Sequence, residues 1–163
     1  MVISPDIIYF FLFSFVVALI GACMGSFASA IAHRTLSGQS WISVVDKNSH
    51  TVKPARSECP LCYHQLSLVD LIPVLSWALS GGKCRYCRQP ISVMYPFVEL
   101  AGALILWLVW CFGCEGWEFI LFALGLPFSL AAFLLMIRKF SPPPYMWGVL
   151  VGQGALLYYV FLF

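Results

Sequence analysis

Long apolar stretches alternate with polar segments along this chain, and four of the apolar stretches are long enough to cross a membrane as helices. About 20 residues of helix span the roughly 30 Å hydrocarbon core of a bilayer. The pattern predicts transmembrane helices at Ile7–Ala32, Ser92–Phe112, Trp117–Ile137 and Tyr145–Phe163. The chain is therefore expected to divide into a first helix within residues 1–33, a polar loop over 34–91, and three further helices within 92–163.

The composition supports an all-α integral membrane protein. Hydrophobic residues make up 61% of the 163 residues and charged residues only 10%, with a mean hydropathy of +0.90. A soluble domain of this size carries about 25% charged residues, so this chain cannot cover itself with polar surface. The net charge of +2 does not indicate a nucleic-acid partner. The first span lacks a basic flank and a small-residue cleavage site, so we expect it to stay as an anchor.

The basic residues predict the orientation. Two of the nine, Arg138 and Lys139, lie between the third and fourth spans, and the hairpin "FGCEGWE" carries two Glu and no basic residue. The other seven lie between the first and second spans: Arg34, Lys47, Lys53, Arg56, Lys83, Arg85 and Arg88. The positive-inside rule places the loop in the cytoplasm and both termini outside, in the periplasm if the membrane is a bacterial inner membrane.

The loop contains two Cys-x-x-Cys pairs, Cys59/Cys62 and Cys84/Cys87, separated by 21 residues. The segments "CPLCYHQLS" and "CRYCRQPIS" also repeat one pattern, which indicates two similar knuckles facing each other. Four thiolates complete the tetrahedral shell of Zn²⁺, and a shell without an open position folds a loop rather than catalyses a reaction. The alternatives are disulfides, which a reducing compartment disfavours, or four unrelated thiols. His64 is close enough in sequence to be an alternative ligand.

The segment "LVDLIPVLSWAL" between the knuckles is too short to span and too apolar to float freely in water. We expect Asp70 or the turn at Pro73 to begin a short helix that rests on the membrane surface or on the other helices, with Trp77 at the interface. Glu99 lies inside the second span, where ionisable groups are costly and often functional. A structural role, such as an ion pair with Arg34 or Arg56, is equally consistent with its position.

Small residues gather in "GACMGSFASA", where Gly21 and Gly25 are four residues apart. Such faces let helices pack closely, and packing is favoured here over a groove for a substrate helix. Cys23 is expected to be a small buried residue of this face. Cys111 and Cys114, near the opposite end of the second span, are interpreted as free thiols rather than a bridge.

The order of these features resembles one family, the type IV prepilin leader peptidases that also N-methylate the processed pilin. The resemblance rests on "GACMGSFASAIAHR", the paired knuckles, the Asp-x-Ile-Pro-x-x-Ser-Trp segment and the Tyr-Pro-x-x-Glu-Leu entry to the second span, roughly Gly21 to Leu104. It implies zinc binding by the four loop cysteines and S-adenosylmethionine as a methyl donor. It also makes Gly25, Ser26, Asp70 and Glu99 candidates for a substrate or methyl-donor site.

This sequence departs from the family pattern in the part that carries the two catalytic aspartates of the protease. The family places one catalytic aspartate after a helix at the cytoplasmic face and a second in a later Gly-x-Gly-Asp motif. Here Arg138, in "MIRKFSPPPY", stands where the first would be, and the sequence ends at Phe163 before the second could occur. A guanidinium cannot replace a carboxylate of such a dyad. The chain alone is therefore not expected to cleave peptides by the family mechanism.

Three functional hypotheses follow from the resemblance. The first is a stand-alone, protease-deficient member of a type IV pilus or type II secretion system that binds prepilin-like helices or assembly components in the lipid bilayer. The second is a prepilin N-methyltransferase, or the complementary half of a split peptidase that works with a separate peptidase chain. The third is a non-enzymatic assembly factor whose zinc loop is a docking surface.

Overall fold

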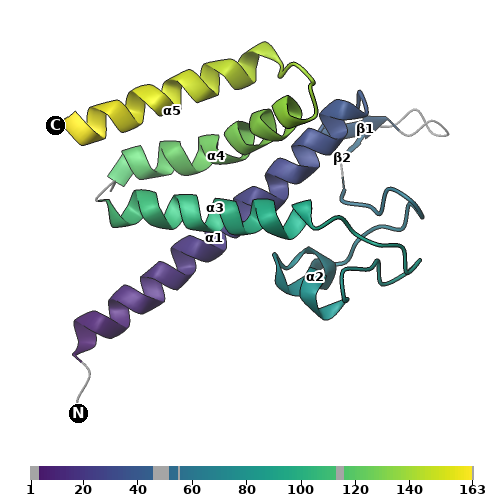
Figure 1. Ribbon diagram of the computed structural model, residues 1–163, viewed down its shortest axis with the longest axis horizontal. Helices are drawn as coiled ribbons and strands as arrows, with labels where there is room; N and C mark the ends of the chain where they lie inside the picture. Colours follow the sequence, from purple (N-terminus) through teal and green to yellow (C-terminus); the bar gives the residue numbers. More distant parts are fainter. Residues whose placement is uncertain (1–3, 46–51, 55, 113–115, 163) are drawn as a thin grey trace.

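The computed structural model describes residues 4–45, 52–54, 56–112 and 116–162, and it consists of long helices with an irregular module at one end (Figure 1). The long helices are α1 (Pro5–Leu36), α3 (Met94–Cys111), α4 (Gly116–Ile137) and α5 (Pro144–Leu162). The chain between α1 and α3, called the knuckle module below, contains the antiparallel pair β1 (Ser43–Val45) and β2 (Val52–Pro54), the 3-10 helix η1 (Leu68–Leu71) and the short helix α2 (Leu75–Leu79).

Three helices in the described part of the chain, α1, α3 and α4, are long and apolar enough to cross a membrane, judged by length and composition. The fourth predicted span is also helical, as α5, although it is not among these three. Phe163, the last residue of that predicted span, lies outside the described residues. The predicted all-α membrane fold is confirmed, with the short β1–β2 hairpin as a local addition.

Helices α1 and α3 cross with their backbones in close contact, because glycines occupy the crossing point. A Cβ atom on Gly25 would lie 2.8 Å from Cα of Glu99 and would overlap the Val98 carbonyl oxygen. A Cβ on Gly21 would likewise lie 2.8 Å from Cα of Ala103. Small residues permit this approach, which brings van der Waals contact between helices that have no hydrophobic driving force in lipid. The small-residue face is therefore a packing surface, as predicted.

Buried side chains form two clusters along the helices. Near the knuckle module, α1, α3, α4 and α5 contribute Ala28, Ile31, Ala32, Val98, Ala131, Ala132, Leu135 and Met146. Farther from it lie Val17, Leu106, Phe122 and Leu126. Trp41, just after α1, packs against the first cluster and stacks edge-on against Phe128 of α4, with ring centroids 5.4 Å apart.

Polar contacts join α4 to α5 within the apolar body. Gln153 of α5 donates to the Phe122 carbonyl oxygen (2.8 Å) and accepts from the Ser129 hydroxyl. Gly125 leaves room for this amide, since a Cβ there would lie 2.6 Å from Nε2 of Gln153. Pro127, which has no N–H to donate, sits inside α4 between these partners. Interhelical hydrogen bonds of this kind hold membrane helices together.

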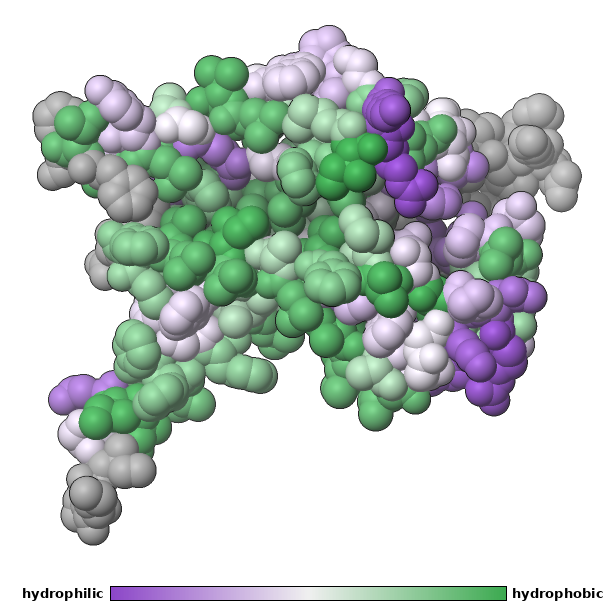
Figure 2. Space-filling view, in the orientation of Figure 1, coloured by the Kyte–Doolittle hydropathy of each residue, from purple (hydrophilic) through white to green (hydrophobic). Residues whose placement is uncertain are grey.

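Hydrophilic residues gather at one end of the molecule, and the helical body is apolar (Figure 2). The knuckle module, the end of α1 and the turn between α4 and α5 all lie at that end (Figure 1). Arg34, in the last turn of α1, donates to the carbonyl oxygens of Ser40 (3.2 Å) and Arg56 (2.7 Å). This guanidinium therefore fastens the start of the module to the first helix.

Candidate metal centre

The two Cys-x-x-Cys segments fold into two copies of one backbone turn. In the first, the Cys59 N–H donates to the His64 carbonyl (3.0 Å), and the Tyr63 N–H donates back to the Cys59 carbonyl (2.9 Å). The second turn repeats both bonds five and four residues after Cys84, at 2.8 and 2.9 Å. The fifth residue of each turn, Tyr63 or Arg88, has a left-handed backbone with φ of 57° or 60°. The sequence repeat is thus also a structural repeat.

The four thiols converge on one point. The Sγ atoms of Cys59, Cys62, Cys84 and Cys87 all lie within 4.8 Å of one another, and those of Cys59 and Cys87 are 3.9 Å apart. Tetrahedral Zn²⁺ with Zn–S bonds of about 2.3 Å places its sulfur ligands about 3.8 Å apart, so the spacing fits such an ion. These four residues could therefore hold a metal ion. The ring of His64 instead stacks on Tyr86, with centroids 3.7 Å apart.

Crowding of the thiols affects their ionisation. Burial acts to raise the pKa of Cys59, but the backbone amides of Cys62 and Leu61 and the neighbouring thiols bring this pKa down to about 7. The amide of Gln89 acts to lower the pKa of Cys87, but burial and the neighbouring thiols raise this pKa to about 11. One thiolate forms readily and further ones are opposed by like charge, which a bound divalent cation would offset.

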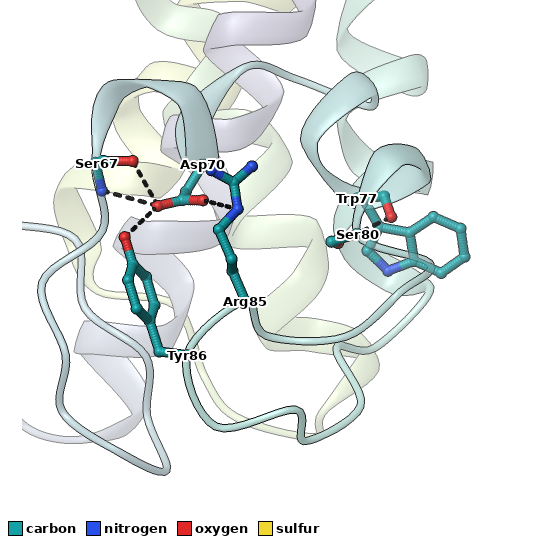
Figure 3. A network of polar contacts seen from close by, with 6 residues as sticks. All are labelled: Ser67, Asp70, Trp77, Ser80, Arg85 and Tyr86. Carbon is teal, nitrogen blue, oxygen red and sulfur yellow. Dashed lines mark hydrogen bonds and ion pairs between the residues drawn. The ribbon is translucent and has the colours of Figure 1, made fainter.

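Asp70 joins η1 to the second knuckle (Figure 3). Its Oδ2 accepts from the Ser67 hydroxyl (2.6 Å), the Ser67 amide (3.1 Å) and the Tyr86 hydroxyl (2.9 Å), and its Oδ1 lies 3.3 Å from Nε of Arg85. The hydrogen bond from the Ser67 hydroxyl lowers the pKa of Asp70 most. Partial burial opposes this effect, and the Ser67 amide, the Tyr86 hydroxyl and Arg85 lower the pKa further. Arg85 and Tyr86 are the two residues between Cys84 and Cys87, so the four-cysteine cluster and η1 are directly connected.

The short helix predicted in the linker is present and begins at the second of its two predicted starts, since α2 begins at Leu75 directly after the turn at Pro73. The 3-10 helix η1, which precedes it, was not predicted. Asp70 is the third residue of η1, where it completes a capping box with Ser67, and it does not begin a helix. A second helix, α2, begins only after Val74, which has a left-handed backbone with φ of 60°. The linker therefore holds two short helices, because Pro73 and the Val74 turn separate them.

Glu99 fastens this linker to α3. Its buried carboxylate accepts a 2.6 Å hydrogen bond from the Val74 amide, and the Trp77 indole N–H donates to the Ile91 carbonyl (3.2 Å). The structure thus gives Glu99 a backbone partner, and Arg34, one of the two cations considered for it, donates to carbonyl oxygens of the module instead.

Residues 19–112 match the family described as the bacterial peptidase A24 N-terminal domain. This range contains most of α1, the entire knuckle module and α3. The chain belongs to this family. The resemblance that the motifs indicated is therefore confirmed, and the A24 domain of this chain ends before α4.

The relatives of this chain are named prepilin leader peptidase/N-methyltransferase. The chain is 37% identical to a prepilin leader peptidase/N-methyltransferase of Myxococcus xanthus over 108 residues, which cover 66% of this chain and 28% of the relative. It is 32% identical to one of Aeromonas hydrophila over 154 residues, or 83% of this chain and 53% of the relative. The chain therefore spans about half or less of these relatives. No solved structure matches it.

Within the A24 domain, the structure brings some of the candidate residues together and separates others. Gly25 of α1 lies against Glu99 of α3, and Glu99 contacts the start of α2, so these three elements meet at one place. Ser26, next to Gly25, is half-buried. Asp70 faces the second knuckle. Arg138 lies beyond the domain, exposed in the turn between α4 and α5.

That turn ends α4 in a regular way. Lys139 has a left-handed backbone with φ of 56°, and the Phe140 amide donates to the Leu135 carbonyl (2.9 Å), as in a Schellman cap. Three prolines then lead into α5. The stretch that carries Arg138 is thus an ordered connection between two helices.

Two features of the thiols and the module were not anticipated from the sequence. Cys23 is exposed on the helical body, so the prediction that it is buried was wrong. It lies two residues from both Gly21 and Gly25, and two helical residues turn about 200°, so its side chain points away from the glycine face of α1. Cys111 is a free thiol, and Cys114 lies outside the described residues.

The roles of Arg85 and Tyr86 in holding Asp70 were also not predicted. Their position between Cys84 and Cys87 is the sequence feature that could have indicated these roles.

Proposed function

We propose that this chain serves a type IV pilus or type II secretion system in a bacterial inner membrane, binding prepilin-like helices or assembly components. Its module would face the cytoplasm and its helix ends the periplasm. The observation that carries the proposal is the A24 domain match over α1, the knuckle module and α3, with relatives named prepilin leader peptidase/N-methyltransferase. The excess of basic residues in the module supports the orientation.

We further propose that the four-cysteine centre holds structural Zn²⁺. The ion would leave no open coordination position and would fold the module rather than take part in a reaction. Arg56, Lys83 and Arg88, which are exposed beside the knuckles, would offset the negative charge of a four-thiolate site.

The 163 residues are proposed to lack the aspartyl protease chemistry of the family. Their aspartates are Asp6, Asp46 and Asp70, so no aspartate follows residue 70. Arg138 occupies the turn where the resemblance places the first catalytic aspartate. A guanidinium cannot exchange a proton as one half of a carboxylate dyad does.

Metal analysis tests the zinc proposal. The purified chain should contain one Zn²⁺ per molecule, and Cys84→Ser should lose it. The matched control Cys23→Ser, which removes an exposed thiol of α1, should retain it. Wild-type protein with no stoichiometric metal would refute a zinc centre.

The functional proposal is tested by reconstituting the chain with a prepilin in liposomes. We expect photo-cross-linking between the prepilin N-terminal helix and this chain, and no cleavage of the leader. The Myxococcus xanthus relative serves as a positive control for cleavage. Cleavage by the chain alone would contradict the missing dyad, and absence of any cross-link would remove the support for prepilin binding.

A second candidate function is N-methylation of a pilin that a separate peptidase has cleaved. Two observations favour it. The relatives are named both as leader peptidases and as N-methyltransferases, and the family match covers the A24 N-terminal domain, while the 163 residues carry no aspartate after Asp70. The donor would be S-adenosylmethionine, and Gly25, Ser26, Asp70 and Glu99 are the residues proposed for its site or the substrate's. Incubating the chain with a pre-cleaved pilin and labelled donor tests this, and no transfer of label would reject it.

A further inference from the structure

The linker Leu68–Leu79, which contains η1 and α2, exposes large apolar side chains at the polar end of the molecule. The exposed fraction is 85% for Leu68, 72% for Leu79, 51% for Val69, 50% for Leu75 and 40% for Ile72. Apolar surface of this extent is unfavourable in water and normally has a covering partner. Neither α1, α4 nor α5 covers these side chains.

The depth of α2 relative to the transmembrane helices identifies that partner. Glu99 is the sixth residue of α3, about 7.5 Å along the helix from Met94. Its carboxylate bonds the amide at the start of α2 (2.6 Å), so α2 lies beside the first turns of α3 rather than beyond them. In Figure 1, α2 is drawn on the side of the knuckles that faces the helical body.

Helix α3 is only about as long as the hydrocarbon core is thick. Its 18 residues extend about 27 Å, close to the roughly 30 Å of hydrocarbon that it must cross. Its first turn therefore lies at the boundary between acyl chains and headgroups. Helix α2, which is bonded to Glu99 in the second turn of α3, lies at this boundary or just inside it.

The polar groups of α2 are suited to that boundary. The Val74 amide is bonded to Glu99, the Trp77 indole to the Ile91 carbonyl, and the Ser80 hydroxyl to the Trp77 carbonyl (3.1 Å). Backbone and side-chain polar groups at membrane depth require such internal partners. Lys83 follows α2 after two glycines and is exposed, where an ammonium can meet a lipid phosphate.

We propose that the linker Leu68–Leu79 is an in-plane membrane anchor whose apolar side chains insert into the acyl–headgroup boundary of the bilayer. The lipid covers the surface that the rest of the chain leaves open, and the knuckles remain in water directly above it. This arrangement would hold the metal centre at a fixed height over the membrane. It is independent of the proposed activity, because it rests only on exposure, depth and polar contacts.

The test uses the metal-loaded full chain in lipid nanodiscs, with a small fluorescent amino acid encoded at one position. Leu79 is the test position. Gln89, exposed on the second knuckle, is the aqueous control, and Phe97, exposed in the first turn of α3, is the lipid control at the same depth. Each protein is measured with lipids brominated near the carbonyl end of the acyl chain and, separately, with aqueous iodide.

We expect the probe at Leu79 to lose fluorescence in brominated lipid as strongly as the probe at Phe97, and to be protected from iodide. The probe at Gln89 should show the opposite behaviour. If Leu79 is quenched by iodide and not by brominated lipid, the surface faces water and the anchor proposal is wrong. A second probe at Leu75 decides the matter if the Leu79 variant does not fold, which retention of bound metal would reveal.

Discussion

At the scale of single residues, the two knuckle turns depend on backbone conformations that their side chains do not favour. Tyr63 and Arg88 both have positive φ in the left-handed region. For a residue with a Cβ this conformation costs roughly 1–2 kcal/mol. The turn maintains it because the Tyr63 N–H must bond the Cys59 carbonyl (2.9 Å) while the thiols converge.

Replacing Tyr63 by glycine should therefore stabilise the first knuckle. Tyr63 is 74% exposed, so little packing is lost. We expect a net gain of about 0.5 kcal/mol, since removal of the Cβ strain exceeds the added flexibility of glycine. The measurement is the thermal unfolding midpoint of the metal-loaded protein. Leu61→Gly, in the same turn without positive φ, should lower the midpoint, and an equal loss in both variants would refute this account.

Asp70 should contribute a constant amount of stability around neutral pH. Its pKa is lowered in the folded protein, so its contribution is fully present above the unfolded value of about 3.9 and is lost as the pH falls through the lower folded value. We expect Asp70→Asn to cost about 1–2 kcal/mol, from weakened bonds to Ser67, Tyr86 and Arg85.

The measurement is chemical unfolding of wild type and Asp70→Asn at pH 6, 7 and 8. The difference in unfolding free energy should be the same at all three values. A difference that changes with pH across this range would show that another group, and not the Asp70 carboxylate, controls the linker.

At the scale of elements, the crossing of α1 and α3 is the contact that positions the module. Gly25 lies against Glu99, whose carboxylate holds α2, so a change in the distance between the two helices reaches the linker directly. The Ser29 hydroxyl, bonded to the Gly25 carbonyl at 3.3 Å, is satisfied within α1 and needs no space from α3.

Gly25→Ala and Gly148→Ala should have opposite effects. The added Cβ at Gly25 would overlap α3 backbone, which cannot move aside as a flexible side chain can, and we expect a loss of about 1–3 kcal/mol. At Gly148 of α5 a Cβ meets nothing within 4 Å, and alanine is the better helix former by about 1 kcal/mol. Thermal unfolding in detergent measures both. Equal tolerance of the two substitutions would show that the α1–α3 crossing is looser than described.

At the scale of the whole molecule, the knuckle module is held from three sides. Arg34 bonds its beginning to α1, Glu99 bonds α2 to α3, and the four cysteines join its two knuckles. The first two contacts do not need a metal, whereas the third depends on the proposed metal ion. Metal loss should therefore loosen the knuckles while the helical body persists.

Limited trypsin digestion with and without a chelator tests this expectation. Metal-loaded protein should resist cleavage at the exposed Lys83 and Arg88, and the chelated protein should be cut there several-fold faster, with helical circular dichroism nearly unchanged. Cys84→Ser should digest rapidly in either condition, and Cys23→Ser should behave as wild type. A digestion rate that the chelator does not alter would contradict a folding role for the metal.

Much of this architecture is readable from local sequence. The four long helices follow from uninterrupted apolar runs, because a backbone in lipid must satisfy its own hydrogen bonds. The four cysteines that could hold a metal ion follow from spacing, since two Cys-x-x-Cys pairs are typical of a zinc site. The repeat "CPLCYHQLS" and "CRYCRQPIS" indicated equal turns, and their backbone bonds agree.

Partners that lie far apart in sequence depended on the tertiary structure. Glu99 was equally consistent with an ion pair or a functional group, and only the position of α2 shows that its carboxylate accepts the Val74 amide. The exposure of Cys23 depended on which side of α1 meets α3. Apolar periodicity does not settle such choices in lipid, because both the packed and the lipid-facing sides of a membrane helix are apolar.

The sequence by itself thus determined the membrane-spanning helices, the four cysteines and their family, since each rests on residue type and spacing alone. The tertiary structure decided which face of each helix packs, that Arg85 and Tyr86 connect the four-cysteine cluster to Asp70, and where α2 lies beside α3. The physical reason is that a hydrogen bond such as the one between Val74 and Glu99 joins residues far apart in the sequence, so it depends on how the linker folds back onto α3 and not on the local residue pattern.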